Sequence, residues 1–344
     1  MPIDLKKLIP FIKDTQIVVT GANGFIGSVI VWQLNQLGFT QIVAVDSVEL
    51  TERNLLQNLK YLKFYSKNDF LKYLKTPDPS RNISWIIHMG ACSSTTETNW
   101  DFLLENNTHY SQTLAEWCCI NKANYIYASS AATYGAGENG FDDHFDSEKL
   151  KPLNLYGESK VLFDRWMLNP SQSPHSKPNC FYGLKFFNVF GPMEYHKESM
   201  ASVVYKSFHL IQKTGQIQLF KSHRSEYKDG EQLRDFVYVK DVSRWILELM
   251  LLKPENGIYN MGFGKARTWL DLARSVFSAM GREPKIEWIA IPENIKNQYQ
   301  YFTEAKMSKL FAQKLSLPQW PLEKAVEDYV QNYLKEGDAF LKAN

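Results

Sequence analysis

The fold of this 344-residue chain is decided by Ile17-Val18-Val19-Thr20-Gly21-Ala22-Asn23-Gly24-Phe25-Ile26-Gly27. A β-branched run stops at Gly21, two more glycines follow at spacings of three, and helix-forming residues then begin. This order predicts a strand, a tight turn and the N-terminus of a helix. The unpaired N–H groups and the dipole of a helix N-terminus attract anions. The stretch therefore predicts a binding site for a pyrophosphate.

Each glycine has a separate physical role in such a turn. Gly21 allows the turn itself, Gly24 lets a phosphate approach the backbone, and Gly27 lets the helix contact the strand. The spacing is G-x-x-G-x-x-G rather than the common G-x-G-x-x-G, so the match rests on mechanism. Glycine-rich turns also occur without a nucleotide, so the neighbouring sequence has to decide.

The second predicted strand, Gln41–Asp46, supplies that context. It ends on Asp46, 19 residues after Gly27. A carboxylate about 20 residues after the glycines is where the adenosine ribose of a dinucleotide is held. The alternative is that Asp46 is an ordinary turn residue at the end of a strand. The glycines upstream favour the ribose contact.

The composition is that of a globular protein of about two domains. A hydrophobic fraction of 44%, a charged fraction of 22% and a net charge of +2 give no argument for nucleic acid or an anionic membrane as a partner. The four cysteines show no zinc or disulfide spacing, which favours a reducing cytoplasm. No apolar run approaches the ~20 residues of a membrane span. Met1–Asp14 is expected to be a helix before the first strand rather than a signal peptide.

Further apolar strands alternate with helical segments. They are predicted within Trp85–Ser93, Asn124–Gly135, Phe181–Val189 and Gly257–Gly262. This alternation predicts the α/β class, with a doubly wound parallel sheet (Rossmann) and a smaller α/β substrate domain. We expect residues 1–187 and 234–264 to form the dinucleotide-binding domain, and residues 188–233 and 265–344 to form the substrate-binding domain. Ligands of such sheets lie beyond the carboxyl ends of the strands.

The charged, leucine-rich stretch Val48–Leu74 is predicted to be a solvated amphipathic helix. Most of its cations, which include Arg53, Lys60, Lys63 and Lys67, are then surface charges. Alternatively, one or two of them meet a 2′-phosphate near the ribose, which is how such sites accept NADP. Periodicity alone leaves both alternatives open.

A tyrosine and a lysine follow the strand that ends in Ser129 and Ser130. Tyr156 and Lys160 are separated by four residues, so they share one face of the helix predicted to begin after Pro152. A phenol with a pKa near ~10 is a poor base at neutral pH. A nearby ammonium and the positive nicotinamide of an oxidised cofactor favour the phenolate. A surface Tyr-x-x-x-Lys pair is the simpler alternative, and the serine-ended strand before it favours the catalytic one.

These pieces resemble the extended short-chain dehydrogenase/reductase family across almost the whole chain. Within that family, the chain is similar to the ADP-L-glycero-D-manno-heptose 6-epimerase subgroup. The residues that carry the likeness are Gly90-Ala91-Cys92-Ser93-Ser94-Thr95-Thr96-Glu97, Ser129-Ser130-Ala131-Ala132-Thr133-Tyr134-Gly135, Pro152-Leu153-Asn154 before Tyr156, Phe187-Asn188-Val189-Phe190-Gly191-Pro192 and His196-Lys197-Glu198-Ser199-Met200-Ala201-Ser202-Val203. The first and last of these are specific to the subgroup.

The resemblance implies epimerisation at C6 of ADP-D-glycero-D-manno-heptose, by transient oxidation to a ketone and return of the same hydride. It implies that Tyr156 and Lys160 are the catalytic pair and that Ser130 bonds the reacting oxygen. Lys197 matches a second acid/base, which suits an oxygen that moves across the pocket. A loop cation near the ADP phosphates is the alternative for Lys197, and both roles together are compatible.

The resemblance also implies the binding residues. For the cofactor, taken to be NADP with NAD as the alternative, they are Gly21, Gly24, Phe25, Ile26, Gly27, Asp46, Ser47, Arg53, Lys67, Met89, Gly90, Ala91, Cys92, Ser93, Asn106, Lys160, Val189 and Lys197. For the ADP-heptose substrate they are Asn188, Ser199, Lys206, Phe220, Lys221, Ser222, His223, Arg234 and Tyr299. Arg234 suits a diphosphate because its guanidinium offers paired donors. A homo-oligomer, a pentamer in the family, is implied as well.

Some residues depart from the family pattern. Met89 stands where the family has an acid, Lys185 where it has arginine, and Lys206 where it has histidine. Residues 221–233 are longer than in the pattern. His223 has no second ligand at a usable spacing, so no metal is expected.

Three other functions are alternatives to C6 epimerisation. A sugar 4,6-dehydratase needs an added acid and base after the serine or threonine of the strand, and Ala131 and Ala132 stand there. A 4-epimerase of another nucleotide sugar remains the alternative enzyme. A cofactor-binding protein without activity is the alternative outside the enzymes, and the presence of Ser130, Tyr156 and Lys160 disfavours it.

Overall fold

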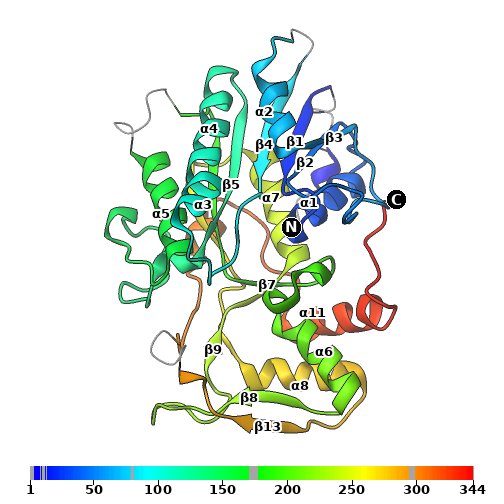
Figure 1. The fold of residues 1–344 in the computed structure, drawn as a ribbon, viewed down its shortest axis with the longest axis vertical. Coiled ribbons are helices and arrows are strands. Elements are labelled where there is room, and N and C mark those ends of the chain that lie inside the picture. The colour runs from blue at the N-terminus through cyan, green and yellow to red at the C-terminus, as the bar shows by residue number, and fades with distance from the viewer. Residues whose placement is uncertain are drawn as a thin grey trace.

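The glycine-rich stretch joins strand β1 (Gln16–Thr20) to helix α1 (Phe25–Gln36), as predicted. The computed structural model describes residues 4–7, 9, 12, 14–78, 81–169, 177–293 and 299–343. Around β1 lies a seven-stranded parallel sheet in the order β11-β6-β5-β4-β1-β2-β3 (Figure 1). Its other strands are β2 (Ile42–Asp46), β3 (Lys63–Ser66), β4 (Ile83–His88), β5 (Asn124–Ser130), β6 (Phe181–Phe186) and β11 (Gly257–Met261). The predicted doubly wound parallel sheet is confirmed.

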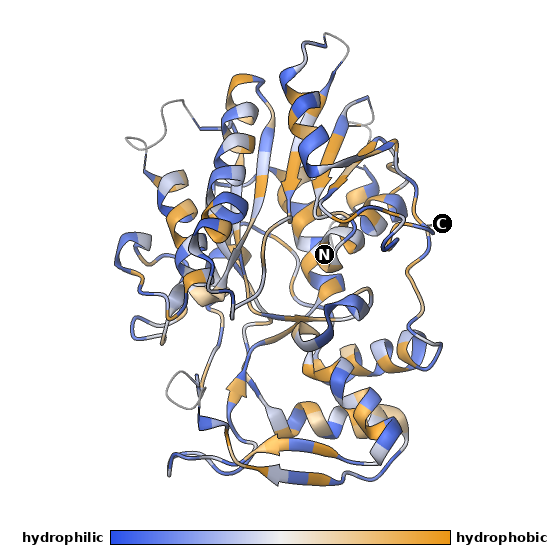
Figure 2. Cartoon of the chain, in the orientation of Figure 1, coloured by the Kyte–Doolittle hydropathy of each residue, from blue (hydrophilic) through white to orange (hydrophobic). Residues whose placement is uncertain are grey.

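Helices cover both faces of this sheet because its strands are apolar on both faces. Ile17 and Val19 pack on one side with α1 and α7 (Val239–Leu252). Val18 points to the other side, where the hydrophobic core includes residues of α2 (Lys67–Lys75), α4 (Tyr110–Ile120) and α5 (Leu155–Leu168). Parallel sheets buried on both faces read as continuous hydrophobic runs, which explains the orange central strands in Figure 2.

A π-helical turn interrupts the helical segment between β4 and β5. The segment begins with α3 (Trp100–Leu103), passes through the π-turn (Leu104–His109) and continues as α4. Single π-turns inside helices are frequent at functional sites. This one holds the asparagine pair Asn106 and Asn107, whose contacts are described below.

A second, smaller group of elements has its own hydrophobic core. It contains residues of α6 (Val203–Thr214), α8 (Trp269–Met280), α11 (Leu322–Tyr329) and β8 (Ile217–Phe220). Its remaining elements, with the short strands that lead to it, are β7 (Asn188–Phe190), β9 (Leu233–Arg234), β10 (Phe236–Tyr238), β12 (Arg267–Thr268), β13 (Ile286–Ile289) and a π-turn (Val330–Leu334). Helix α10 (Ser308–Ala312) instead packs with the large sheet, where Leu310 is part of the core. The division of the chain into two domains at the boundaries given above stays a prediction.

The C-terminal segment returns from α11 to the large sheet (Figure 1). The Lys342 carbonyl accepts a hydrogen bond from Trp32 Nε1 at 3.1 Å. Leu341 is buried with Phe25, Met193 and other apolar side chains. The C-terminal segment therefore packs against α1.

Two sequence predictions need correction or fall outside the described residues. The helix predicted over Val48–Leu74 is wrong, because Lys63–Ser66 form the edge strand β3 and the helix begins only at Lys67. Pairing with β2 explains the difference, since β2 offers Lys63–Ser66 a backbone partner that periodicity cannot reveal. In the predicted N-terminal helix, Leu5–Lys7 form one 3₁₀ turn. Residues 1–3, 8, 10, 11 and 13 lie outside the described part.

Within the described ranges, every helix is too short or too polar to cross a membrane.

Candidate active site

The turn after β1 is closed tightly against the end of β4. Gly21 has a φ of +64°, and a Cβ there would lie 2.7 Å from the Gly90 nitrogen. A Cβ on Gly27 would lie 2.0 Å from the Gly21 carbonyl oxygen. Gly24 is the N-cap of α1 and has no side chain to bond the first helical N–H groups. These groups are therefore available to an anion, as the glycine pattern predicted.

Asp46 ends β2 beside this turn and is buried. Its carboxylate accepts hydrogen bonds from the backbone nitrogens of Asn23 at 2.9 Å and Val48 at 3.0 Å. Burial raises the pKa of Asp46, while these backbone bonds and Arg53 oppose the rise. Arg53 Nε donates to the Asn23 carbonyl at 2.9 Å. A carboxylate and a guanidinium are thus held together at the end of β2.

A buried hydrogen-bond chain fixes the backbone beneath the turn. Thr20 Oγ1 accepts from the Gly90 nitrogen at 3.1 Å and lies 2.6 Å from His88 Nδ1. His88 Nε2 lies 3.0 Å from Ser111 Oγ, which donates to the Asn107 carbonyl at 2.8 Å. Because the Ser111 proton is already used, His88 Nε2 must donate and Nδ1 must accept. Burial lowers the pKa of His88 well below its usual value, which agrees with a neutral ring.

The two asparagines of the π-turn have different tasks. Asn107 is fully buried; its Oδ1 accepts from the Cys92 nitrogen at 2.8 Å, and its Nδ2 donates to the Cys92 carbonyl at 3.0 Å and to Ser159 Oγ at 3.0 Å. Asn106 Oδ1 instead accepts from Lys67 Nζ at 2.7 Å. Asn107 therefore holds the loop after β4, whereas Asn106 and Lys67 line the cavity.

The predicted catalytic residues come together at the end of β5 and the start of α5. Asn154 caps α5 through its hydrogen bond from the Gly157 nitrogen at 2.8 Å, which sets the helix start one residue before Tyr156. Burial raises the pKa of Tyr156, and a side-chain hydrogen bond with Ser130 opposes the rise. Lys160 Nζ donates to the Ala128 carbonyl at 3.0 Å. Burial lowers the pKa of Lys160 to about 8.

Lys197 lines the same cavity from the 3₁₀ segment Tyr195–Met200. Its Nζ lies 5.4 Å from the centre of the Phe25 ring, and burial lowers its pKa while Glu194 opposes the change. Glu194 is buried and anchors the segment by accepting bonds from the Gly191 nitrogen at 3.2 Å and from Ser202 Oγ at 2.7 Å.

One cavity of about 570 Å³ gathers the predicted catalytic and cofactor residues. It is lined by Gly21, Gly24, Phe25, Ile26, Gly27, Asp46, Ser47, Arg53, Lys67, Met89, Gly90, Ala91, Cys92, Ser93, Asn106, Ser130, Tyr156, Lys160, Val189 and Lys197. His196 lines it too and was missed, although it directly precedes Lys197; burial and Arg53 lower its pKa to about 4. Asn107, which supports the loop after β4, was not predicted.

The predicted substrate residues lie outside the lining of this cavity. Five of them form a cluster with two further aromatic side chains: Phe220, Ser222, His223, Arg234 and Tyr299, with Trp269 and Tyr301. The Arg234 guanidinium is buried 5.2 Å from the centre of the Tyr299 ring. Trp269 Nε1 donates to the Tyr299 hydroxyl at 3.1 Å. Of the other four, Asn188, Ser199, Lys206 and Lys221 are exposed, and Lys206 Nζ donates to the Ser199 carbonyl at 3.2 Å.

A possible metal group elsewhere is disfavoured by a lysine. Asp142, Asp143 and His144 have ligand atoms within 4.8 Å of one another. However, Lys306 Nζ lies 2.6 Å from Asp142 Oδ2 and already neutralises that carboxylate. The predicted non-ligand His223 has its Nδ1 2.8 Å from the Tyr301 hydroxyl.

A doubly wound sheet, a glycine turn open to phosphate, and Ser130, Tyr156 and Lys160 beside it define a nicotinamide dinucleotide-binding protein of the short-chain dehydrogenase/reductase class. The uncapped backbone N–H donors at the start of α1 and the closely packed glycines fit such a cofactor. Residues 17–262 match the model of the NAD dependent epimerase/dehydratase family, and the chain belongs to that family.

Similarity to individual proteins extends over nearly the whole chain. The chain is 43% identical over 335 residues to the ADP-L-glycero-D-manno-heptose-6-epimerase of Fusobacterium nucleatum, covering 94% of this chain and 100% of that one. It is 45% identical over 326 residues to the protein of that name from Nitratidesulfovibrio vulgaris, covering 94% and 99%. The crystal structure of the Helicobacter pylori ADP-L-glycero-D-manno-heptose-6-epimerase matches with a TM-score of 0.74 at 27% identity, covering 93% and 96%.

Proposed function

We propose that the chain converts ADP-D-glycero-D-manno-heptose to ADP-L-glycero-D-manno-heptose by inverting C6 through a transient ketone. The observation that carries the proposal is that Ser130, Tyr156, Lys160 and Lys197 share one cavity with the phosphate turn. The names of relatives that are 43% and 45% identical over 94% of the chain support the choice of substrate.

A dinucleotide held by the glycine turn and Asp46 would supply hydride chemistry at C6, first as acceptor and then as donor. Tyr156 takes the proton of the C6 hydroxyl, and Ser130, which bonds Tyr156, holds the same oxygen. Lys160 stabilises the phenolate that Tyr156 must become. Burial raises the pKa of Tyr156 and so opposes the phenolate, whereas positive charge from Lys160 and from an oxidised nicotinamide would favour it.

Lys197 serves the second half of the reaction. Rotation of the ketone moves its oxygen to the other side of the pocket, where a second proton-transferring group is needed. Burial lowers the pKa of the half-buried Lys197, which suits proton transfer. Its alternative role is to bind an ADP phosphate. A Lys197→Met enzyme with low kcat supports proton transfer, whereas a raised KM alone supports phosphate binding.

The cluster around Arg234 is proposed to hold the ADP part of the substrate. Phe220 and Tyr299, whose rings are 5.9 Å apart, offer apolar surfaces to adenine. The Arg234 guanidinium offers the diphosphate a charged, forked donor. Asn188, at the start of β7, connects this cluster to the cavity because it directly precedes Val189.

NADP is proposed as the preferred dinucleotide. Arg53 and Lys67 both line the cavity near Asp46, where the adenosine ribose is expected. Two cations there suit a 2′-phosphate. NAD is the alternative, because Asp46 is the residue type that bonds an unphosphorylated ribose. A cytoplasmic homo-oligomer, with a separate dinucleotide-binding and substrate-binding domain, completes the proposal.

The test is to incubate the purified protein with ADP-D-glycero-D-manno-heptose and to follow the C6 configuration by NMR, after identifying the dinucleotide that copurifies. We expect both C6 epimers to appear and NADP to be retained through turnover. A protein that retains a dinucleotide but never changes C6, while it interconverts a 4-epimeric pair of nucleotide sugars, would overturn the proposal in favour of the alternative enzyme.

A further inference from the structure

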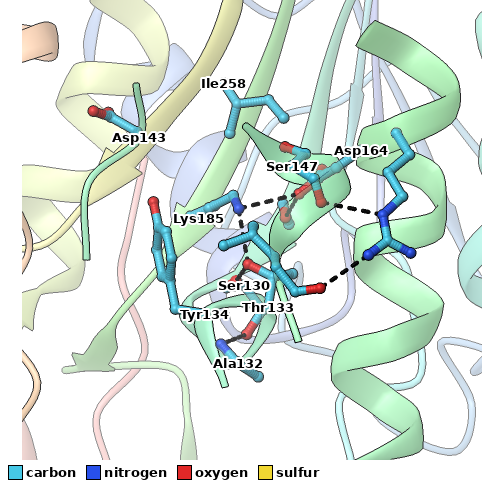
Figure 3. A network of polar contacts seen from close by, with 12 residues as sticks. Ser130, Ala132, Thr133, Tyr134, Asp143, Ser147, Asp164, Lys185 and Ile258 are labelled. Atoms are coloured by element: carbon cyan, nitrogen blue, oxygen red, sulfur yellow. Dashed lines mark hydrogen bonds and ion pairs between the residues drawn. The ribbon is translucent and has the colours of Figure 1, made fainter. Parts of the chain in front are cut away.

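A buried ion pair lies directly behind the candidate active site. Asp164 on α5 and Lys185 on β6 are 0% and 2% exposed, and Asp164 Oδ2 is 3.6 Å from Lys185 Nζ. Figure 3 shows Lys185 between Asp164 and Thr133, with dashed lines to both. Replacing a buried ion pair by apolar residues is often neutral or stabilising, so stability alone is a weak reason for it.

The Asp164 carboxylate is bound on both oxygens to β5. Tyr127 donates its hydroxyl to Oδ1 at 3.1 Å, and Ser129 donates its hydroxyl to Oδ2 at 2.7 Å. Gly183 on the neighbouring strand leaves the room for this arrangement, because a Cβ there would lie 2.4 Å from the Tyr127 hydroxyl. Asp164 follows Lys160 by four residues, so both lie on the face of α5 that meets β5. The Asp164 carboxylate and the Lys160 ammonium thus both bond residues near the end of β5.

The other half of the pair leads to Ser130. Lys185 Nζ donates to Thr133 Oγ1 at 2.9 Å and lies 4.3 Å from the centre of the Tyr134 ring. Thr133 Oγ1 in turn donates to the Ser130 carbonyl at 2.7 Å. The backbone that carries the Ser130 hydroxyl is therefore anchored, through Thr133, to the ion pair.

Several titratable groups face these charges. Around Lys160 they are Asp164, Cys92 and His88; around Asp164 they are Lys160, Lys185, Tyr127, Tyr134 and Tyr156; around Lys185 they are Asp164, Asp143 and Lys309. Asp164 is the first of the charges that raise the pKa of Lys160 against the effect of burial. A lysine fully removed from water needs such a counter-charge to stay an ammonium.

We propose that Asp164 is a positioning residue whose carboxylate keeps Lys160 charged and, together with Lys185, fixes the strand end that presents Ser130. The assignment rests on the proposed function, because Lys160 and Ser130 are proposed to act in that reaction. Neither Asp164 nor Lys185 lines the cavity, so their effect passes through Lys160 and Ser130.

Asp164→Asn in the dinucleotide-bound protein tests the proposal, because asparagine keeps the shape and removes the charge. The protonation of Lys160 is measured by competitive acylation across pH, with peptide mass spectrometry. We expect the parent midpoint near the pKa of about 8 and the variant midpoint lower by about one unit. The alkaline limb of the kcat–pH profile moves down by the same amount.

A double variant and a control keep the test decisive. Asp164→Asn leaves Lys185 buried without its counter-charge, which could destabilise the fold, and Asp164→Asn/Lys185→Met removes that lysine. The Lys160 acylation midpoint of the double variant is also expected to fall below that of the parent. Asp241→Asn removes an equally buried carboxylate, paired with Arg244 at 2.7 Å on α7, and leaves the Lys160 midpoint unchanged. Folded Asp164 variants with the parental midpoint and kcat–pH profile overturn the proposal. A parent protein that fails to epimerise defeats the proposed function, whereas the labelling midpoint still decides the role of Asp164.

Discussion

The cofactor cavity and the Arg234 cluster were both predicted from sequence, but they are built in different ways. The cavity takes its residues from the ends of parallel strands and the helices that follow them, and every residue predicted for it lines it. The predicted residues of the Arg234 cluster come from short strands and connecting segments, and only five of the nine predicted substrate residues belong to it. The other four, Asn188, Ser199, Lys206 and Lys221, are exposed and lie outside both the cluster and the cavity lining.

The largest effect is expected in the cavity, where a single hydroxyl performs the proton transfer. Tyr156→Phe should lower kcat by about 10³-fold, within the range usual for general acid–base groups, and the dinucleotide should stay bound. The matched control is Tyr182→Phe, which removes a hydroxyl near the start of β6 that donates to the Pro254 carbonyl at 2.9 Å and does not line the cavity. Turnover by Tyr156→Phe at the rate of the control would remove Tyr156 from the reaction.

The phosphate turn should show the next largest effect. Gly21→Ala forces both a left-handed backbone and a contact of 2.7 Å with the Gly90 nitrogen, so the copurifying dinucleotide should be lost. Gly38→Ala is the matched control, because Gly38 also has a positive φ, of +83°, but open space around it. Overpacking should cost Gly21→Ala about 1–3 kcal/mol beyond the control in the free energy of unfolding. Equal stability and equal dinucleotide content in the two variants would contradict a tightly closed turn.

The Arg234 cluster should respond through binding rather than through chemistry. Arg234→Met keeps the length of the side chain and removes its charge, and we expect KM for the nucleotide sugar to rise about 10–100-fold with kcat nearly unchanged. Lys206→Met, on an exposed residue of α6, serves as the comparison and should raise KM less. A fall in kcat with unchanged KM would place Arg234 in the chemical step and erase the contrast between the two regions.

The smallest effect concerns the buried hydrogen-bond chain under the turn. The folded protein disfavours the protonation of His88, whose pKa is well below that of an unfolded histidine. The unfolded chain therefore binds a proton first as the pH falls below about 6.5, and stability declines by about 1.4 kcal/mol per pH unit from that point. Thermal unfolding of the parent and of His88→Gln, compared between about pH 7 and pH 5.5, should show a steeper decline in the parent, because His196 contributes to the decline in both proteins. A constant difference between the two proteins would contradict the neutral His88.

The same contrast explains how far the sequence could lead. Glycine spacing, the acid at the end of β2 and the Tyr156–Lys160 spacing are local patterns, and local patterns predict which residues reach the edge of a parallel sheet. The edge strand β3 was missed because its stabilising partner, β2, lies at a distance in sequence. Asp164 and Lys185 were not predicted as a pair, because they lie 21 positions apart in the sequence. Only the folded sheet brings Asp164 on α5 within 3.6 Å of Lys185 on β6. Tyr301 and Trp269 joined the Arg234 cluster for the same reason.

In the proposed reaction, one hydride leaves C6 and returns to it within a single cavity. The direct measurement uses ADP-D-glycero-D-manno-heptose with deuterium at C6, incubated with the purified protein in ordinary water and followed by NMR and mass spectrometry. Return of the same hydride predicts that both C6 epimers form and that both keep the deuterium. Formation of the second epimer with hydrogen from water at C6 would contradict it.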